Sequence, residues 1–203
     1  MLDARLRGVP IPAEIADRLA FLTDAFGDTP GGWGLIETGM AEAAIAADHV
    51  RLAGRDTTDL GNMIRSMSHV LHAIDPAEVG NGFGLGYGVR RSAQAMLFHL
   101  DAVAAESEIP PAVRLHVDLA KGGASGALQH AEAAIALARS VQRATTPQQA
   151  HRLVDRLSDL VRAMAYGRDA DGDGRIGYHE AESGLAQATY HLNVLRAMER
   201  SGG

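Results

Sequence analysis

Apolar residues recur every three or four positions along almost the whole chain, which is the spacing of one face of an α-helix. The pattern predicts seven helices and no strand beyond a two-residue bridge. Amphipathic helices joined by short turns pack against one another in antiparallel bundles. We therefore expect an all-α fold in one domain, 1–203, with helices at residues 12–26, 35–53, 56–75, 89–107, 111–143, from 146 to the loop at 167, and 178–199.

Composition narrows the function classes. With 203 residues and 46% apolar content, the chain is long enough to bury a core. No apolar run reaches the roughly 18 residues of a membrane span. A net charge of −6 and only 4% aromatic residues argue against a nucleic-acid partner. The chain has no cysteine, which excludes disulfides, thiolate catalysis, iron–sulfur clusters, zinc fingers and covalently attached haem.

Residues 169–180 read Asp-Ala-Asp-Gly-Asp-Gly-Arg-Ile-Gly-Tyr-His-Glu and resemble the loop of the EF-hand calcium-binding family. Ca²⁺ prefers oxygen ligands at about 2.3–2.6 Å. The resemblance implies a glycine at the sixth place, where the chain turns sharply, and a glutamate at the twelfth place that binds through both oxygens. The ligands that it implies are the side chains of Asp169, Asp171, Asp173 and Glu180 and the backbone carbonyl of Arg175.

The residues around this loop bear on what the ion does. Ala181 and Gly184 are small where the family places bulky contacts, so a calcium-driven opening of the helices is not favoured. The leading function is calcium binding that stabilises the fold, and a calcium-sensing interaction module is an alternative. A protein partner or homodimer stays open. Gly177 at the ninth place gives no side-chain ligand, which favours millimolar calcium. We expect a periplasmic or secreted protein if a signal peptide was removed, and a cytoplasmic one otherwise.

EF-hands usually occur in pairs, and residues 26–37 are a candidate partner loop. On the same frame, Glu37 falls at the twelfth place, but Phe26 and Pro30 occupy ligand places, so this loop should not hold an ion. It could pair with the calcium loop through a bridge between Trp33 and Ile176. In this interpretation 12–53 forms a degenerate EF-hand, 56–143 the central helices and 146–199 the true EF-hand.

Histidine supplies a second hypothesis. Helical spacing places five histidines and one glutamate on inward faces, where bundles build sites for transition metals or non-covalent haem. A protein for binding, storage or transfer of such a group is therefore an alternative function, and hydrogen bonding of each ring within the bundle is the other interpretation. His69 and His72 could form a surface metal clip. The inward candidates are Glu42, His49, His99, His116, His130 and His191.

Within this set, His116 and His130 lie two heptads apart on one helix. A rise of about 1.5 Å per residue puts them about 21 Å apart, so they cannot bind the same ion.

Residues 80–88 form a glycine-rich run that precedes Arg90 and Arg91. Successive backbone amides before a helix can bind an anion. No predicted strand precedes the run and its spacing matches no nucleotide-binding pattern, so a structural connection between helices is the favoured interpretation. In that case Phe83 and Tyr87 should attach it to the bundle. No local arrangement of nucleophile and base is present, which favours a role other than catalysis.

Overall fold

A computed structural model describes residues 11–202. The first ten residues, which contain no apolar segment typical of a signal peptide, and Gly203 lie outside this range. Within it no residue is in a β-strand, and no helix is long and apolar enough to cross a membrane. The predicted all-α fold is therefore confirmed. The helices are α1 (Ala13–Thr23), α2 (Leu35–Ala53), α3 (Leu60–Ile74), α4 (Val89–Ala104), α5 (Pro111–Gln142), α6 (Pro147–Tyr166) and α7 (Leu185–Gly202), with 3₁₀ turns at Pro30–Gly32 and Pro76–Glu78.

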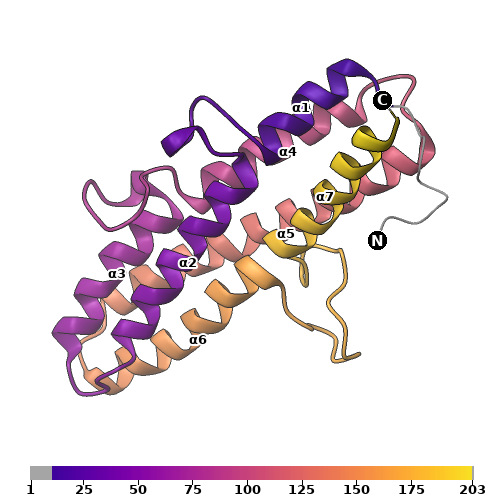
Figure 1. Ribbon diagram of the computed structural model, residues 1–203. Helices are drawn as coiled ribbons and strands as arrows, with labels where there is room; N and C mark the ends of the chain where they lie inside the picture. Colours follow the sequence, from indigo (N-terminus) through magenta and orange to yellow (C-terminus); the bar gives the residue numbers. More distant parts are fainter. Residues whose placement is uncertain (1–10, 203) are drawn as a thin grey trace.

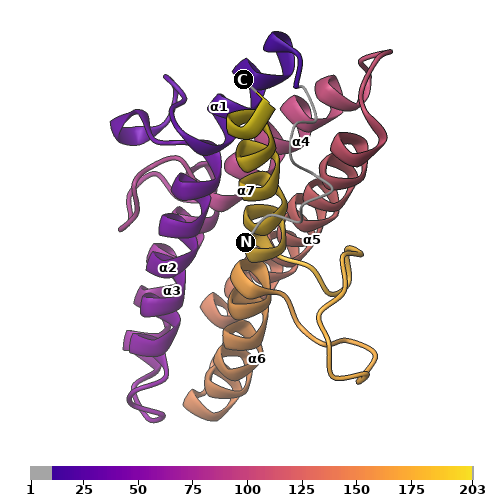
Figure 2. The ribbon, with the colours of Figure 1, turned by 45° about the vertical axis from the view of Figure 1, so that its right-hand side comes forward.

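The bundle is elongated (Figures 1 and 2). It consists of two four-helix sections that share α5. In one section α3 and α6 pack on the C-terminal part of α5, and α2 packs on α3 and α6; in the other α4 and α7 pack on the N-terminal part of α5, and α1 packs on α4 and α7. The chain passes from one section to the other at three loops: residues 24–34 between α1 and α2, residues 75–88 between α3 and α4, and residues 167–184 between α6 and α7. Loops 75–88 and 167–184 therefore lie near the middle of the bundle.

The core owes its close helix spacing to alanine. The central helix α5 buries a row of small side chains, so neighbouring backbones can approach it closely. Larger side chains from the surrounding helices, including Met63, Met67, Met96 and Met164, fill the remaining space and are fully buried. The alanines of this row are Ala120, Ala124, Ala127, Ala131, Ala134 and Ala138.

Most predicted helix boundaries hold. Helix α2 covers the predicted residues, and α6 begins as expected, with the Thr146 side chain accepting a hydrogen bond from the Gln149 amide. Small differences occur in α1, α3 and α4. Helix α1 is shorter than predicted and α4 ends earlier, at Ala104. Helix α3 is capped by Asp59, not Asp56, because the Asp56 carboxylate is taken up by the turn at Thr58.

The largest boundary error concerns α7, which begins at Leu185 and not near residue 178. The carbonyl of His179 accepts hydrogen bonds from the amides of Glu182 and Ser183, which closes a tight turn. The Ser183 hydroxyl also lies 2.7 Å from the Gly122 carbonyl on α5. These contacts hold the backbone in turns until α7 can start.

Glycine residues do not interrupt α5 as the sequence allowed. They form a contact site for other segments. A Cβ on Gly122 would lie 2.1 Å from the Tyr178 carbonyl oxygen, one on Gly126 would lie 2.2 Å from the Ser183 carbonyl oxygen, and one on Gly123 would lie 2.4 Å from the Ala188 nitrogen. Only glycine lets loop 167–184 and α7 lie this close to α5.

The two halves of the chain repeat one order of elements: helix, helix, glycine-containing loop, helix. In the first half these are α2, α3, loop 75–88 and α4, and in the second α5, α6, loop 167–184 and α7. The sequence Ala-Glu-Ala-Ala-Ile-Ala occurs in both α2 (41–46) and α5 (131–136). An aromatic residue followed by His-Leu occurs in both α4 and α7. The loops can therefore be compared as counterparts.

Candidate metal-binding loop

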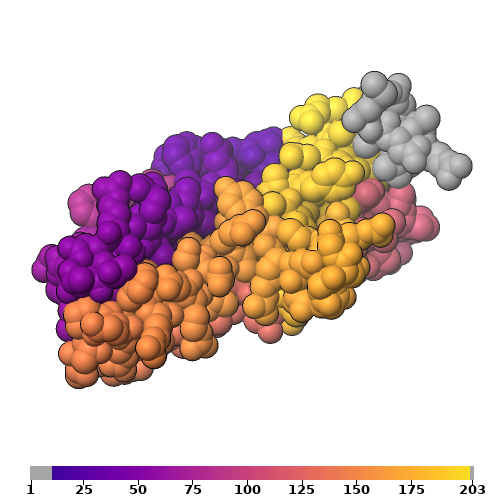
Figure 3. Space-filling view, turned by 90° about the horizontal axis from the view of Figure 1, so that it is seen from below, coloured from indigo at the N-terminus to yellow at the C-terminus, as the bar shows by residue number. Residues whose placement is uncertain are grey.

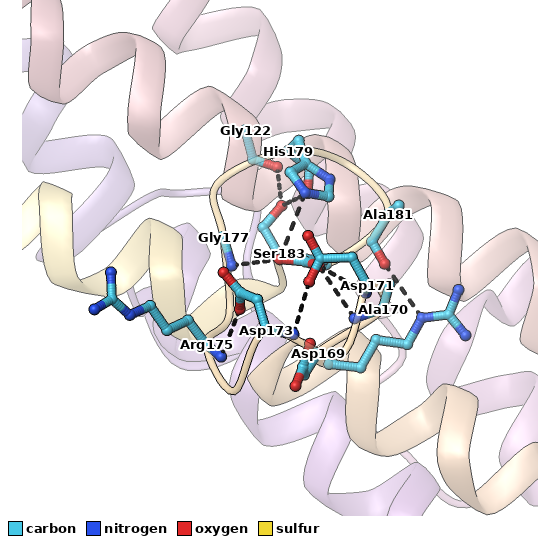
Figure 4. A network of polar contacts seen from close by, with 12 residues as sticks. Gly122, Asp169, Ala170, Asp171, Asp173, Arg175, Gly177, His179, Ala181 and Ser183 are labelled. Carbon is cyan, nitrogen blue, oxygen red and sulfur yellow. Dashed lines mark hydrogen bonds and ion pairs between the residues drawn. The ribbon is translucent and has the colours of Figure 1, made fainter.

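Three aspartates from the predicted calcium loop come together in the structure. Asp169, Asp171 and Asp173 each offer a carboxylate oxygen within 4.8 Å of the others, and all three are exposed. The turn is built by their own side chains: Asp169 accepts hydrogen bonds from the amides of Gly172 (2.7 Å) and Gly174 (2.9 Å). Figure 4 shows these aspartates on one loop, and Figure 3 shows the loop at the surface.

The remaining turn contacts use one oxygen of each aspartate. Asp171 Oδ1 accepts from the Asp173 amide at 3.1 Å, and Asp173 Oδ1 accepts from the Arg175 amide at 2.8 Å. The Oδ2 atoms of both residues can therefore turn toward a cation. Gly172 and Gly174 have φ angles of 79° and 83°, which favour glycine. The sharp turn that the sequence predicted at Gly174 is thus formed.

The two ends of the loop are joined at its base. The Arg168 amide donates to the Glu182 carbonyl at 2.7 Å, and the Arg168 Nε donates to the Ala181 carbonyl at 3.2 Å. Gly167, at φ 76°, lies directly beneath, where a Cβ would meet both the Glu182 carbonyl and the Ile176 side chain. The base therefore fixes where the aspartates sit relative to α6.

Glu182 organises the interior of the loop, and sequence reasoning missed this role. Its buried carboxylate accepts hydrogen bonds from the amides of Gly177 (2.7 Å), Ala170 (3.1 Å) and Asp171 (3.2 Å). These hydrogen bonds, with that of Gly177 the largest contribution, lower the pKa of Glu182. One feature of the sequence could have indicated this role: Glu182 stands just before Ser-Gly at the start of an apolar helix pattern.

Glu180, the predicted twelfth-place ligand, is exposed and does not join the aspartate cluster. The reason is the late start of α7: Glu180 stands in the turn before the helix and not in its first helical turn. Its neighbours His179 and Ala181 are also exposed.

The loop rests on α5 and α7 through Tyr178. The Tyr178 carbonyl lies over Gly122, and its ring packs against the His191 ring with centroids 4.7 Å apart. Ser183 attaches the other end of the loop to Gly122 (Figure 4). The loop is thus joined to two helices as well as to α6.

The predicted pairing of this loop with residues 26–37 is wrong. No strand or bridge residue occurs between residues 11 and 202, and the two loops lie on different sides of the bundle (Figures 1 and 2). The Trp33 carbonyl accepts hydrogen bonds from the Phe26 amide and the Thr29 hydroxyl, so this loop closes on itself. The helices do pack as expected, α1 against α7, and α2 against α6 and α7.

The six inward candidates do not share one site. Within residues 11–202, the aspartate cluster is the only group of three or more potential metal ligands. His99, His130 and His191 are buried, whereas His49 and His116 are half-buried. His99 lies among Phe21, Phe26 and Phe98, with ring centroids 5.3–5.5 Å away. Burial lowers the pKa of His99 and of His130, and nearby arginines, Arg18 and Arg168 respectively, lower it further.

Glu42 binds the glycine-rich loop and is not available to a metal. It is fully buried, and its carboxylate accepts from the amides of Tyr87 (2.9 Å), Gly88 (2.9 Å) and Leu85 (3.1 Å). The sequence predicted that these amides could bind an anion, and in the structure that anion is the Glu42 side chain. Tyr87 is buried as expected, but Phe83 is 63% exposed.

The two histidines of the predicted surface metal site, His69 and His72, also contact the glycine-rich loop. His69 Nδ1 accepts from the Phe83 amide at 3.2 Å, and His72 Nδ1 lies 3.3 Å from the Val79 carbonyl. His69 further packs against the His49 ring, with centroids 4.6 Å apart. Burial, followed by the charge of His69, lowers the pKa of His49.

One histidine pair faces nitrogen to nitrogen. His116 on α5 and His191 on α7 bring their Nδ1 atoms to 2.8 Å. Burial lowers the pKa of both rings, and the charge of His116 contributes at His191, whose pKa falls to about 4. Both rings are therefore uncharged at neutral pH. Rings this close leave no room for a porphyrin between them.

None of the protein families, curated proteins or solved structures compared with this chain matches it.

Proposed function

We propose that loop 169–180 binds a calcium ion that holds α6 and α7 in place. The observation that carries this proposal is the cluster of Asp169, Asp171 and Asp173, with oxygens within 4.8 Å of one another on a turn that is already formed. Ca²⁺ takes about six to eight oxygen ligands. The Arg175 carbonyl, Glu180 after a change in its turn, and water would complete the shell.

A stabilising role fits better than a sensing role because α7 already buries its apolar face. A calcium sensor must expose an apolar groove when the ion binds. Here the face of α7 is packed against α5, and the loop is attached to both helices through Tyr178 and Ser183. The buried side chains are Leu185, Ala188, His191, Leu192, Leu195 and Met198.

Calorimetric titration of the protein, first treated with chelator, tests the proposal. We expect one calcium ion per chain, with a Kd of about 10⁻⁴–10⁻³ M, because the ninth place is a glycine. An ion that binds only the folded state stabilises it by about 2.7 kcal/mol at 100 times its Kd. For a chain of this size, that corresponds to a rise in melting temperature of about 5–10 °C.

Variants localise the effect. Replacement of Asp171 and Asp173 by asparagine should abolish the binding heat and the calcium-dependent rise in melting temperature. The matched control is Asp155→Asn, an exposed aspartate on α6 farther from the loop, which should retain both. No binding heat at 10 mM calcium, or an equal rise in the double variant, would contradict the proposal. A calcium-dependent increase in binding of an apolar dye would favour the sensing role.

A further inference from the structure

His116 and His191 bring two ring nitrogens from different helices into direct contact. Their Nδ1 atoms are 2.8 Å apart and their ring planes are tilted by 32°. The two residues stand on helices whose backbones meet at Gly123 and Ala188, where no Cβ would fit. The two nitrogens are therefore directed at one point by helices that cannot move apart without losing this packing.

A metal ion and a hydrogen bond would use the facing nitrogens differently. A neutral imidazole carries one N–H and one lone pair, so in a hydrogen bond one Nδ1 donates its proton to the other. A metal ion would instead accept the lone pairs of both Nδ1 atoms, and each ring would carry its proton on Nε2. His191 Nε2 is buried and has no partner within the described part of the chain in either arrangement, so the close approach of the two Nδ1 atoms is the observation that points to a metal.

We propose that His116 and His191 form a binding site for a zinc-class transition-metal ion, with Nδ1 of each ring as a ligand and water in the other positions. Zn–N bonds of about 2.0–2.1 Å in tetrahedral geometry place two nitrogen ligands about 3.3 Å apart. The observed 2.8 Å separation is about 0.5 Å shorter. His116 is half-buried, so its ring has room for this adjustment and solvent can reach the ion.

Two tyrosines fix the orientation of the His191 ring. Tyr178 and Tyr190 lie with ring centroids 4.7 Å and 5.0 Å from it, both edge to face. Tyr178 belongs to loop 167–184, so this site adjoins the aspartate loop but uses none of its ligands. Imidazole nitrogen selects zinc-class metals, whereas carboxylate oxygen selects calcium. The two sites would therefore bind different ions.

The other histidine pair provides an internal control. At His49 and His69, one Nδ1 already accepts a hydrogen bond from Phe83, and the Phe83 ring lies 5.5 Å from that of His49. Arg55 and Arg65 line the adjacent cavity, which disfavours a cation. His49 and His69 are also two neighbouring histidines, but they should therefore not bind the metal.

Titration with Zn²⁺, and with Co²⁺ as a coloured substitute, tests the proposal in the full chain with excess calcium present. We expect one equivalent to bind, and tetrahedral Co²⁺ to give visible absorption bands. His116→Gln and His191→Gln should each weaken binding by about 100-fold or more, because loss of a ligand exceeds the 10–100-fold effect of losing a second-shell partner. His69→Gln should bind as the unchanged protein does.

A measurement on the unchanged protein covers the case in which a variant does not fold. With ¹⁵N-labelled histidine, Zn²⁺ should shift the Nδ1 resonances of two residues, and these should be the two whose signals broaden together on Co²⁺ addition. The absence of a stoichiometric zinc site overturns the proposal, as does a site that survives both substitutions or a shift at His49 and His69 instead. Binding that persists after Asp171 and Asp173 are replaced separates this result from the calcium proposal.

Discussion

Loops 75–88 and 167–184 stand at matching places in the two halves of the chain, yet their backbones are held differently. In loop 75–88, three amides meet the carboxylate of Glu42, which comes from a neighbouring helix and is fully buried. In loop 167–184, three amides meet Glu182, which belongs to the loop itself. Only the second loop adds three clustered aspartates.

The two loops differ in how their negative charge is balanced. Glu42 places its negative charge against backbone N–H groups in the core, so loop 75–88 has its counter-charge within the protein. The aspartates of loop 167–184 also accept amides, but three exposed carboxylates remain close together. Two like charges about 4 Å apart repel by about 1 kcal/mol even in water, and a divalent cation would relieve this repulsion.

Removal of the Glu42 carboxylate should have the largest effect on stability. Glu42→Ala leaves three amides without their partner, and each costs about 1–3 kcal/mol when buried. We expect a loss of about 3–5 kcal/mol in the free energy of urea unfolding. Glu42→Gln, which keeps one acceptor oxygen, should lose less. Glu37→Ala, on an exposed position of the same helix, is the control; a loss below about 1 kcal/mol for Glu42→Ala would refute the assigned role.

Replacement of Gly122, one of the glycines where α5 contacts loop 167–184, should have the next largest effect on stability. The effect should be confined to that loop. In Gly122→Ala the new Cβ would meet the Tyr178 carbonyl, so the loop must move away from α5. We expect a net loss of about 2–4 kcal/mol, although alanine gains about 1 kcal/mol in helix propensity.

Hydrogen exchange should show the amides of residues 167–184 becoming less protected in this variant while those of 75–88 stay unchanged. Gly54→Ala, where the new Cβ would lie 3.8 Å from the nearest atoms, should leave stability equal or slightly higher. Equal loss of protection in both loops would mean that the contact site does not serve the second loop specifically.

Variants of Glu182 and Glu180 should distinguish residues that hold the loop together from residues that bind the ion. Glu182→Gln should reduce stability by about 1–2 kcal/mol in chelator, because a charged acceptor of three amides becomes neutral. Glu180→Gln should not change stability in chelator and should weaken calcium binding. Unfolding curves with and without calcium measure both effects, and an exchange of these two behaviours would assign the ligand role to Glu182.

The smallest expected effect is the contribution of His99 to the stability of the protein at low pH. The pKa of His99 lies below its ordinary 6.5, chiefly because of burial and then because of Arg18. The folded state therefore favours the neutral ring. The stability that this preference contributes is complete above pH 6.5 and is lost as the pH falls below 6.5. The loss is at most about 1.4 kcal/mol per pH unit. In His99→Phe the fall in stability from pH 7 to 5.5 should be smaller; an unchanged slope would exclude this contribution.

Helices could be predicted from the sequence because their apolar spacing is local. The cap at Thr146 and the length of α2 followed from residues within one helical turn of the boundary. The start of α7 could not be predicted because a contact far away in sequence decides it. The hydrogen bond between Ser183 and Gly122 joins residues 61 positions apart, and no local pattern contains it.

The candidate site was predictable where side chains alternate within a few residues, as Asp169, Asp171 and Asp173 do. The roles of Glu42 and Glu182 were not, because their partners are backbone amides, which every residue carries and no sequence pattern distinguishes. The histidine pairing depended on how α5 and α7 are rotated against each other. Helical spacing places a histidine on a face but does not choose its neighbour.

The unbroken course of α5 sets the length of the molecule. Its 32 residues correspond to a rod of about 48 Å, and both four-helix sections are built onto it. Because the glycines of α5 are covered by loop 167–184 and α7, the rod has no free point at which to bend. The two ends of the protein are therefore held at a constant spacing.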